Sequence, residues 1–271
     1  GCYEGITVFR GIPYAAPPVG ALRFRPPADP QAWSGVRDCD TDPPIAMQDC
    51  HLTPSYEPQR SDFYWRGMPA CSEDCLYLNI ATGSIPDAPE APLLPVLLWF
   101  HDGLSGGYAY EPEFDPAALA SKRVVVVSVG HRLHLFGYLL LSQLANEQRG
   151  AGGNYGLMDQ FKALYWVCDN IAGFGGDPDN ITVGGQGGGA EKSAVLATSP
   201  KTRGRVRRLI NQSGLFWLRW FREPDIAERD SHRHLMSVGI DPDLSPDALR
   251  ALPARDLLGP TDRMIAFHPS M

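Results

Sequence analysis

The chain has 271 residues, 44% of them hydrophobic, which is enough to bury the core of one domain of ordinary α/β size. Its formal net charge of −7 argues against nucleic acid or an anionic membrane as a partner, because binding to phosphate depends on clustered Lys and Arg. No apolar run reaches the roughly 18 residues of a membrane span, and the six cysteines lack the spacing of a zinc site, so we expect no membrane span, metal or cofactor.

The first part of the chain combines a short strand with irregular segments. Residues 5–20 are expected to begin as a strand and to continue as a proline-rich arm, since two Pro-Pro pairs occur by Pro27. Residues 28–69 are polar and interrupted by proline, which predicts an excursion over the surface.

The middle of the chain alternates strands with helices. Residues 96–100 and 124–129 are apolar runs typical of strands covered on both faces, and residues 76–81 alternate between apolar and polar. Helical spacing occurs at residues 116–121 and 158–171. This alternation predicts an α/β fold with a mostly parallel, doubly wound sheet.

The segment from Asn180 to Lys192 is the one around which the chain is organised. A β-branched run precedes five glycines with one glutamine among them, and a helix former follows. This order predicts a strand, a tight turn and a helix, which is how α/β-hydrolases present a nucleophile in the pattern G-x-S-x-G. Here the central position of the pattern is Gly187, so the hydroxyl is absent.

The same glycine turn also matches part of a dinucleotide fingerprint, with Gly185, Gly187 and Ala190 after a strand. That fingerprint requires an acidic residue about 20 positions later. Residues 205–215 contain none, so we favour the hydrolase interpretation over nucleotide binding.

The chain after the turn is basic at first and then helical. Four arginines cluster here, and we interpret them as a solvated face: Arg203, Arg205, Arg207 and Arg208. Residues 208–212 are expected to form a strand. Residues 224–238 and 245–258 are expected to form helices, with Asp or Ser as caps and glycine as stops.

Several motifs in sequence order carry a family resemblance. They are the glycine turn with the run that leads into it, Asn170–Val183, and the segments Gly11–Gly20, Ser72–Asn79 and Gly153–Gln160. Together they resemble the type-B carboxylesterase family, which includes the cholinesterases. The resemblance implies one partial α/β-hydrolase domain over residues 1–271, corresponding to the N-terminal half of the family domain, with the C-terminal strands missing.

The resemblance also implies a catalytic triad that this chain does not supply. Gly187 stands at the serine's place, and the family's acid and histidine come after the point that residue 271 matches. His232, His234 and His268 match no family motif, and we expect them to be surface helix and tail residues. Ser193 lies inside the helix, away from the apex of the turn, so we do not expect it to replace the nucleophile.

The resemblance places the family's oxyanion loop, H-G-G-G-F, at residues 101–105. Asp102 and Leu104 replace glycines there, so the remnant of the oxyanion hole would consist of Gly103, Leu104 and Gly188. Asp102 would place a negative charge near a developing anion. Residues 130–134 also depart from the family's N-Y-R-L-G, and changes at several separate positions indicate natural decay of the site.

Cys75 matches the family cysteine that closes a disulfide loop. The resemblance implies Cys50 as its partner, with Cys71 as the alternative. A disulfide favours an oxidising compartment, so we expect a secreted or extracytoplasmic protein, with a cytoplasmic location as the alternative.

The sequence is consistent with three functions. The chain is a non-catalytic homologue that kept the scaffold, a binding or adhesion module like the family's cell-surface members that lost the serine, or a carboxylic ester hydrolase completed by another chain. We expect a protein partner or self-association through the sheet edge at residues 209–212, since this stretch lacks the prolines and inward charges that protect natural edges.

Overall fold

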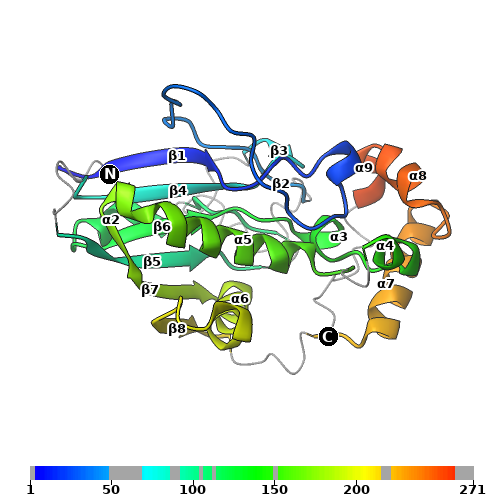
Figure 1. Cartoon of the computed structure of the whole chain (residues 1–271). Coiled ribbons are helices and arrows are strands. Elements are labelled where there is room, and N and C mark those ends of the chain that lie inside the picture. The colour runs from blue at the N-terminus through cyan, green and yellow to red at the C-terminus, as the bar shows by residue number, and fades with distance from the viewer. Residues whose placement is uncertain are drawn as a thin grey trace, which may run out of the picture.

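The computed structural model describes residues 4–48, 69–85, 92–103, 106–111, 114–148, 152–214 and 221–259. A six-stranded sheet forms its centre, with the strand order β1-β4-β6-β5-β7-β8 (Figure 1). In that order the strands are Thr7–Pro13, Tyr77–Thr82, Val125–Val129, Leu94–Phe100, Gly176–Gln186 and Arg208–Gln212. A separate parallel pair is formed by β2, Ile45–Ala46, and β3, Cys71–Ser72.

The sheet is mixed and mostly parallel. β6, β5, β7 and β8 pair in parallel, whereas β1 and β4 join through antiparallel pairs at one side. The expected α/β fold is therefore confirmed, and each expected strand is present within a few residues of its predicted position. All five residues of β6 are buried, as the apolar run predicted for a strand covered on both faces.

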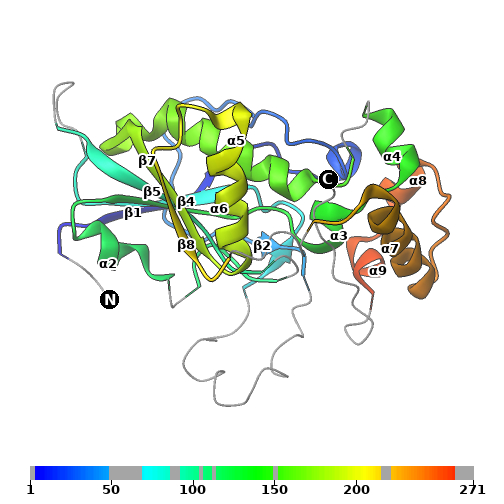
Figure 2. The same ribbon diagram turned by 90° about the horizontal axis from the view of Figure 1, so that it is seen from below.

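Helices cover both faces of the sheet (Figures 1 and 2). Adjacent residues of β5 show this, because Leu97 packs with Ala120 of α2 whereas Leu98 packs with Leu164 of α5 and Leu196 of α6. The α-helices are α2 Pro116–Ala120, α3 His134–Tyr138, α4 Ser142–Glu147, α5 Tyr155–Asn170, α6 Gly188–Thr198, α7 Pro224–Ser237, α8 Pro246–Ala251 and α9 Ala254–Leu258. Short 3₁₀ helices are η1 Gly20–Leu22, η3 Ile171–Phe174 and η4 Pro200–Thr202.

The expected helix at residues 245–258 is two helices instead of one. Pro253 follows α8 and precedes α9, and Leu252 before it is extended, with φ −69° and ψ 145°. A proline lacks the N–H that would continue the helix, and its ring disfavours the helical conformation of the preceding residue. The sequence interpretation also missed α3 and α4, which are only five and six residues long.

A second apolar core lies beside the sheet domain's main core. It joins Phe24 of the arm to Leu135 of α3, Leu144 of α4, Leu235 of α7 and Leu249 of α8. In Figures 1 and 2 these helices gather at the end of the molecule opposite α2.

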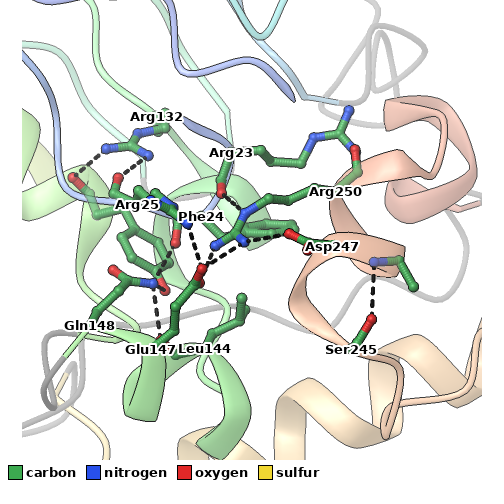
Figure 3. Close-up of polar contacts among 12 residues, drawn as sticks. Arg23, Phe24, Arg25, Arg132, Leu144, Glu147, Gln148, Ser245, Asp247 and Arg250 are labelled. Atoms are coloured by element: carbon green, nitrogen blue, oxygen red, sulfur yellow. Dashed lines mark hydrogen bonds and ion pairs between the residues drawn. The ribbon is translucent and has the colours of Figure 1, made fainter. Parts of the chain in front are cut away.

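Two arginines connect the arm to these helices (Figure 3). The Arg23 guanidinium donates to the main-chain oxygens of Arg250, at 2.9 Å, and Leu252, at 2.5 Å, and so caps the end of α8. In return, Arg250 donates through Nε to the main-chain oxygen of Arg23 at 2.9 Å and forms an ion pair with Glu147 of α4. Glu147 also accepts from Arg25, at 2.5 Å. The arm and α8 are thus held together by main-chain as well as side-chain groups.

The predicted disulfide of Cys75 is wrong, because Cys75 is a free thiol, as are Cys39 and Cys168. Its side chain is 2% exposed and belongs to the main core beside Leu76, where burial raises the pKa of the thiol. Cys50 lies outside the described residues, and Cys71 is not among the free thiols. The expectation of an extracytoplasmic location therefore loses the support that a Cys75 disulfide would have given it.

Among the helices of the described residues, none is long and apolar enough to cross a membrane.

Candidate functional site

The glycine turn forms the predicted strand, turn and helix. β7 ends at Gln186, α6 begins at Gly188, and Gly187 between them has φ 52° and ψ −119°, a conformation that strains any residue with a Cβ. The Gly187 N–H donates to the main-chain oxygen of Gln212 at 2.8 Å. At Gly189 a Cβ would lie 2.6 Å from the main-chain oxygen of His101, so the glycines allow the turn to pack directly against the loop after β5.

Two backbone N–H groups from this turn and this loop converge on one oxygen atom. Gly103 and Gly188 donate to Oδ1 of Asp102 at 2.6 and 2.7 Å. Two such donors directed at one point are the arrangement that stabilises an oxyanion in acyl transfer. The structure thus brings together two of the three residues predicted for the oxyanion remnant, while Leu104 lies outside the described residues.

The carboxylate of Asp102 also lies where a side chain on Gly187 would begin. A Cβ built on Gly187 would lie 2.6 Å from Cγ and 2.8 Å from Oδ2 of Asp102, well inside van der Waals contact. Asp102 and a side chain at position 187 therefore exclude each other unless one of them moves. The sequence predicted a negative charge near this point, but not that the carboxylate would occupy it.

Lys192 holds the loop after β5 in place through its main chain. Its side chain is 3% exposed, and Nζ donates to the main-chain oxygen of Gly103 at 2.5 Å and contacts Nε2 of His131 at 3.1 Å. Fixing the carbonyl of Gly103 also helps to fix the loop that carries the Gly103 N–H. Burial lowers the pKa of Lys192 to about 7, against the opposing effect of Asp102, Glu111 and Glu191.

Sequence reasoning missed Lys192, although its position carried a signal. It lies four residues after Gly188, so on a helix it shares a face with that oxyanion donor.

Two histidines stack next to Lys192, with ring centroids 4.6 Å apart and planes inclined by 3°. Burial lowers the pKa of His101 to about 3 and that of His131 well below its ordinary value, and the charge of Lys192 lowers both further. Nδ1 of His101 lies 2.7 Å from the main-chain oxygen of Asp102, so this nitrogen donates. Near neutral pH, therefore, neither imidazole ring carries a positive charge that could form an ion pair with Asp102.

Glu191 adds a second carboxyl group at the start of α6. Burial raises its pKa to about 7, and the charge of Asp102 contributes in the same direction, while Lys192 opposes it. The first turn of α6 therefore carries an acid that titrates near neutrality, a feature that is common at functional sites but is not specific to them.

The structure places the other candidate residues away from the turn's apex. Ser193 is fully buried, and its hydroxyl donates to the main-chain oxygen of Gly189 at 2.8 Å. The expectation that His234 lies at the surface is wrong, because it is 1% exposed and packs edge-on against His134 at 5.6 Å. The physical reason is that the side of α7 that carries His234 packs against α3. His268 lies outside the described residues.

No group of three or more His, Cys, Asp or Glu that could hold a metal ion occurs in the described part of the chain.

Comparison with known proteins identifies the family. A model of the carboxylesterase family matches residues 2–269. The chain belongs to this family. A member of known structure, a carboxylesterase from Geobacillus stearothermophilus, is similar with a TM-score of 0.82 and 38% identity, over 100% of this chain and 53% of that one.

Two curated family members show how much of the family domain the chain represents. Fumonisin B1 esterase of Sphingopyxis macrogoltabida is 42% identical over 219 residues, which cover 79% of this chain and 38% of that protein. Para-nitrobenzyl esterase of Bacillus subtilis (strain 168) is 37% identical over 263 residues, which cover 96% of this chain and 50% of that protein. The chain therefore spans about half the length, or less, of these relatives. The fold described above matches the N-terminal half of the carboxylesterase structure.

Proposed function

We propose that this chain is a non-catalytic member of the carboxylesterase family, in which Asp102 occupies the oxyanion cradle that Gly103 and Gly188 form. The observation that carries the proposal is the position of Asp102 Oδ1, which accepts hydrogen bonds from both N–H groups. The cradle is retained as a structural feature and is filled by the protein's own carboxylate.

The chemistry of ester hydrolysis supports this proposal in two independent ways. Gly187 has no side chain with which to attack, and removing the serine of a hydrolase triad costs roughly a million-fold in turnover. A carboxylate in the cradle also takes the hydrogen bonds that a tetrahedral intermediate requires. Two like charges about 4 Å apart repel each other by about 4 kcal/mol at an effective dielectric constant of about 20.

The test is hydrolysis of short-chain p-nitrophenyl esters by the purified chain and by the single variants Gly187→Ser and Asp102→Gly. We expect no turnover above buffer for the natural chain or for either single variant. In Gly187→Ser the carboxylate still competes for the cradle, and in Asp102→Gly the nucleophile is still absent. Turnover by the natural chain that survives repurification and is abolished by a serine-directed phosphonate would contradict the proposal.

The same assay addresses the alternative in which another chain completes an esterase. That alternative requires a nucleophile from outside, and Asp102 would still occupy the cradle. Turnover that appears only when a native extract is added, and that depends on the presence of this chain, would support it. A binding role is compatible with the absence of turnover.

A further inference from the structure

A groove lies on the outer side of α5, away from the glycine turn. Its volume is about 490 Å³, which is within the range of about 300–1,000 Å³ for ligand pockets. On the outward side of α5, the side chains of Leu157, Phe161 and Tyr165 are only partly buried. The groove is lined by Pro26 and Pro27 of the arm, by Leu157, Phe161 and Tyr165 of α5, and by Lys201 of η4.

One border of the groove is strongly basic. The segment from η4 to the start of β8 carries exposed cations in a chain whose net charge is −7. Within the described residues, none of these cations has an acidic side chain within 4 Å of it. The basic border, as we name it, consists of Lys201, Arg203, Arg205, Arg207 and Arg208. No ion pair within the described residues therefore holds these cations, although the charge of Asp169 acts on Arg205 and Arg208 donates to Asn180.

Two cations of the basic border, Lys201 and Arg205, lie directly at the groove. The guanidinium carbon of Arg205 lies 5.1 Å above the ring of Tyr165, and the Tyr165 hydroxyl donates to the main-chain oxygen of Lys201 at 3.3 Å. Figure 2 shows the segment between α6 and β8 running beside α5, with the blue arm on the other side of the helix. Charged and apolar groups are thus available to one ligand at the same time.

One carboxylate of this protein already forms an ion pair with a residue that lines the groove. Lys162, which also lines the groove, forms an ion pair with the exposed Asp29 of the arm. This pair shows that a carboxylate can reach one cation of the groove, Lys162. In the part of the chain that the structure describes, no carboxylate forms such an ion pair with the basic border.

We propose that the α5 groove and its basic border bind an acidic segment of a partner protein, with an apolar side chain seated on Phe161 and Tyr165 and carboxylates on the basic border. Charge complementarity selects the partner, because these cations have no acidic side chain within 4 Å among the described residues and attract acidic groups at long range. The apolar floor provides a fixed anchor point, as in other peptide-binding grooves. This proposal is independent of the esterase chemistry. The oxyanion cradle lies where β7 ends and α6 begins, whereas η4 follows the other end of α6.

Fluorescence anisotropy with a short labelled peptide tests the proposal. The probe carries Asp and Glu on both sides of a central Phe-Leu pair, and two matched probes replace either the Phe-Leu pair with Gly-Ser or the acidic residues with Lys. We expect the acidic probe with Phe-Leu to bind and both matched probes to bind at least about tenfold more weakly, a difference of about 1.4 kcal/mol. Binding should weaken when salt rises from about 50 to about 200 mM, because exposed charges are then screened more strongly.

Charge-reversal variants locate the site. We expect the double variant Lys201→Glu and Arg203→Glu to weaken binding at least about tenfold, and Phe161→Ala to weaken it several-fold with an unchanged circular dichroism spectrum. Arg229→Glu is the matched control, since Arg229 is an exposed cation of α7, which lies with α8 and α9 at the end of the molecule opposite α2 (Figure 1), and it should change binding less than about twofold.

Three results would overturn the proposal. The first is no binding of the acidic Phe-Leu probe. The second is equal binding of the probe without Phe-Leu, or stronger binding of a single-stranded oligonucleotide, which would indicate a general polyanion surface. The third is an equal loss of binding in Arg229→Glu and in the double variant, which would indicate that only the net charge matters.

Discussion

At the scale of single residues, Asp102 and Gly187 compete for one small volume. A Cβ at position 187 would lie 2.6 Å from Cγ of Asp102, and φ at this position is 52°. We expect Gly187→Ser and Gly187→Ala to destabilise the fold by about 1–3 kcal/mol each, because both add the same Cβ in a strained backbone conformation. Chemical denaturation measures the loss.

The matched background for this prediction is Asp102→Gly. In that background the contact with the carboxylate is gone and only the backbone strain remains, so the same substitutions at position 187 should cost less. An equal cost in both backgrounds would show that Asp102 moves aside freely and does not occlude the site.

Lys192 makes stability depend on pH. Its pKa is about 7 in the folded chain, below the ordinary value of 10.5, because burial disfavours the charged amine. Between these two values the unfolded state binds a proton that the folded state does not, so this residue makes stability rise with pH from about 7 to about 10.5. The difference between the natural chain and Lys192→Met should therefore change by more than about 1 kcal/mol across that window.

Denaturation of both proteins at several pH values tests this prediction. Lys201→Met, which removes an exposed lysine of the basic border, is the control and should run parallel to the natural chain. A Lys192→Met curve that is parallel as well would show that Lys192 keeps its ordinary pKa in the folded state.

At the scale of elements, the arm and α8 depend on each other through Arg23 and Arg250. Arg250 is 6% exposed and donates both to a main-chain oxygen and to Glu147. We expect Arg250→Met to destabilise the fold by about 1–3 kcal/mol, since the oxygens of Arg23 and Glu147 lose a charged donor. In limited proteolysis, the region from α7 to α9 should then be cut faster in Arg250→Met than in the natural chain.

The same ion-pair network contains its own control. Asp247 lies 3.4 Å from Arg250, but its side chain is 96% exposed, and exposed ion pairs contribute little. Asp247→Asn should therefore cost less than about 0.5 kcal/mol. A similar loss for both variants would mean that the contact with the arm does not stabilise α8.

At the scale of the whole molecule, β8 is the outer strand of the sheet. It pairs only with β7 among the described strands, and Leu209 and Ile210 are 40% and 39% exposed. We propose that a second copy of the chain pairs along this edge, because a two-fold axis lets the same five residues meet in an antiparallel ladder. We expect dimers in sedimentation at low micromolar concentration, and a shift toward monomer for Ile210→Lys.

Leu119→Lys is the control, since Leu119 is an exposed leucine on α2, away from β8. It should leave the oligomeric state unchanged. A stable monomer of the natural chain, with cooperative unfolding and no binding of a hydrophobic dye, would show that this edge is tolerated alone.

The sequence by itself determined the local structure and the family. Apolar runs predicted the central strands because strands covered on both faces need apolar side chains in succession, as in β5 and β6. The glycines around position 187 predicted the tight turn because only glycine fits its backbone conformation and its close packing. Each of these inferences depends on neighbours within one segment.

Only the tertiary structure decided what the site contains. Asp102 and Gly188 are 86 residues apart in sequence, and Lys192 and Gly103 are 89 apart, yet these pairs form the cradle and its support. The burial of His234 and the free thiol of Cys75 likewise depend on which elements pack together. Periodicity reports the conformation of a segment, whereas the place of a side chain among distant residues follows from the packing of whole elements.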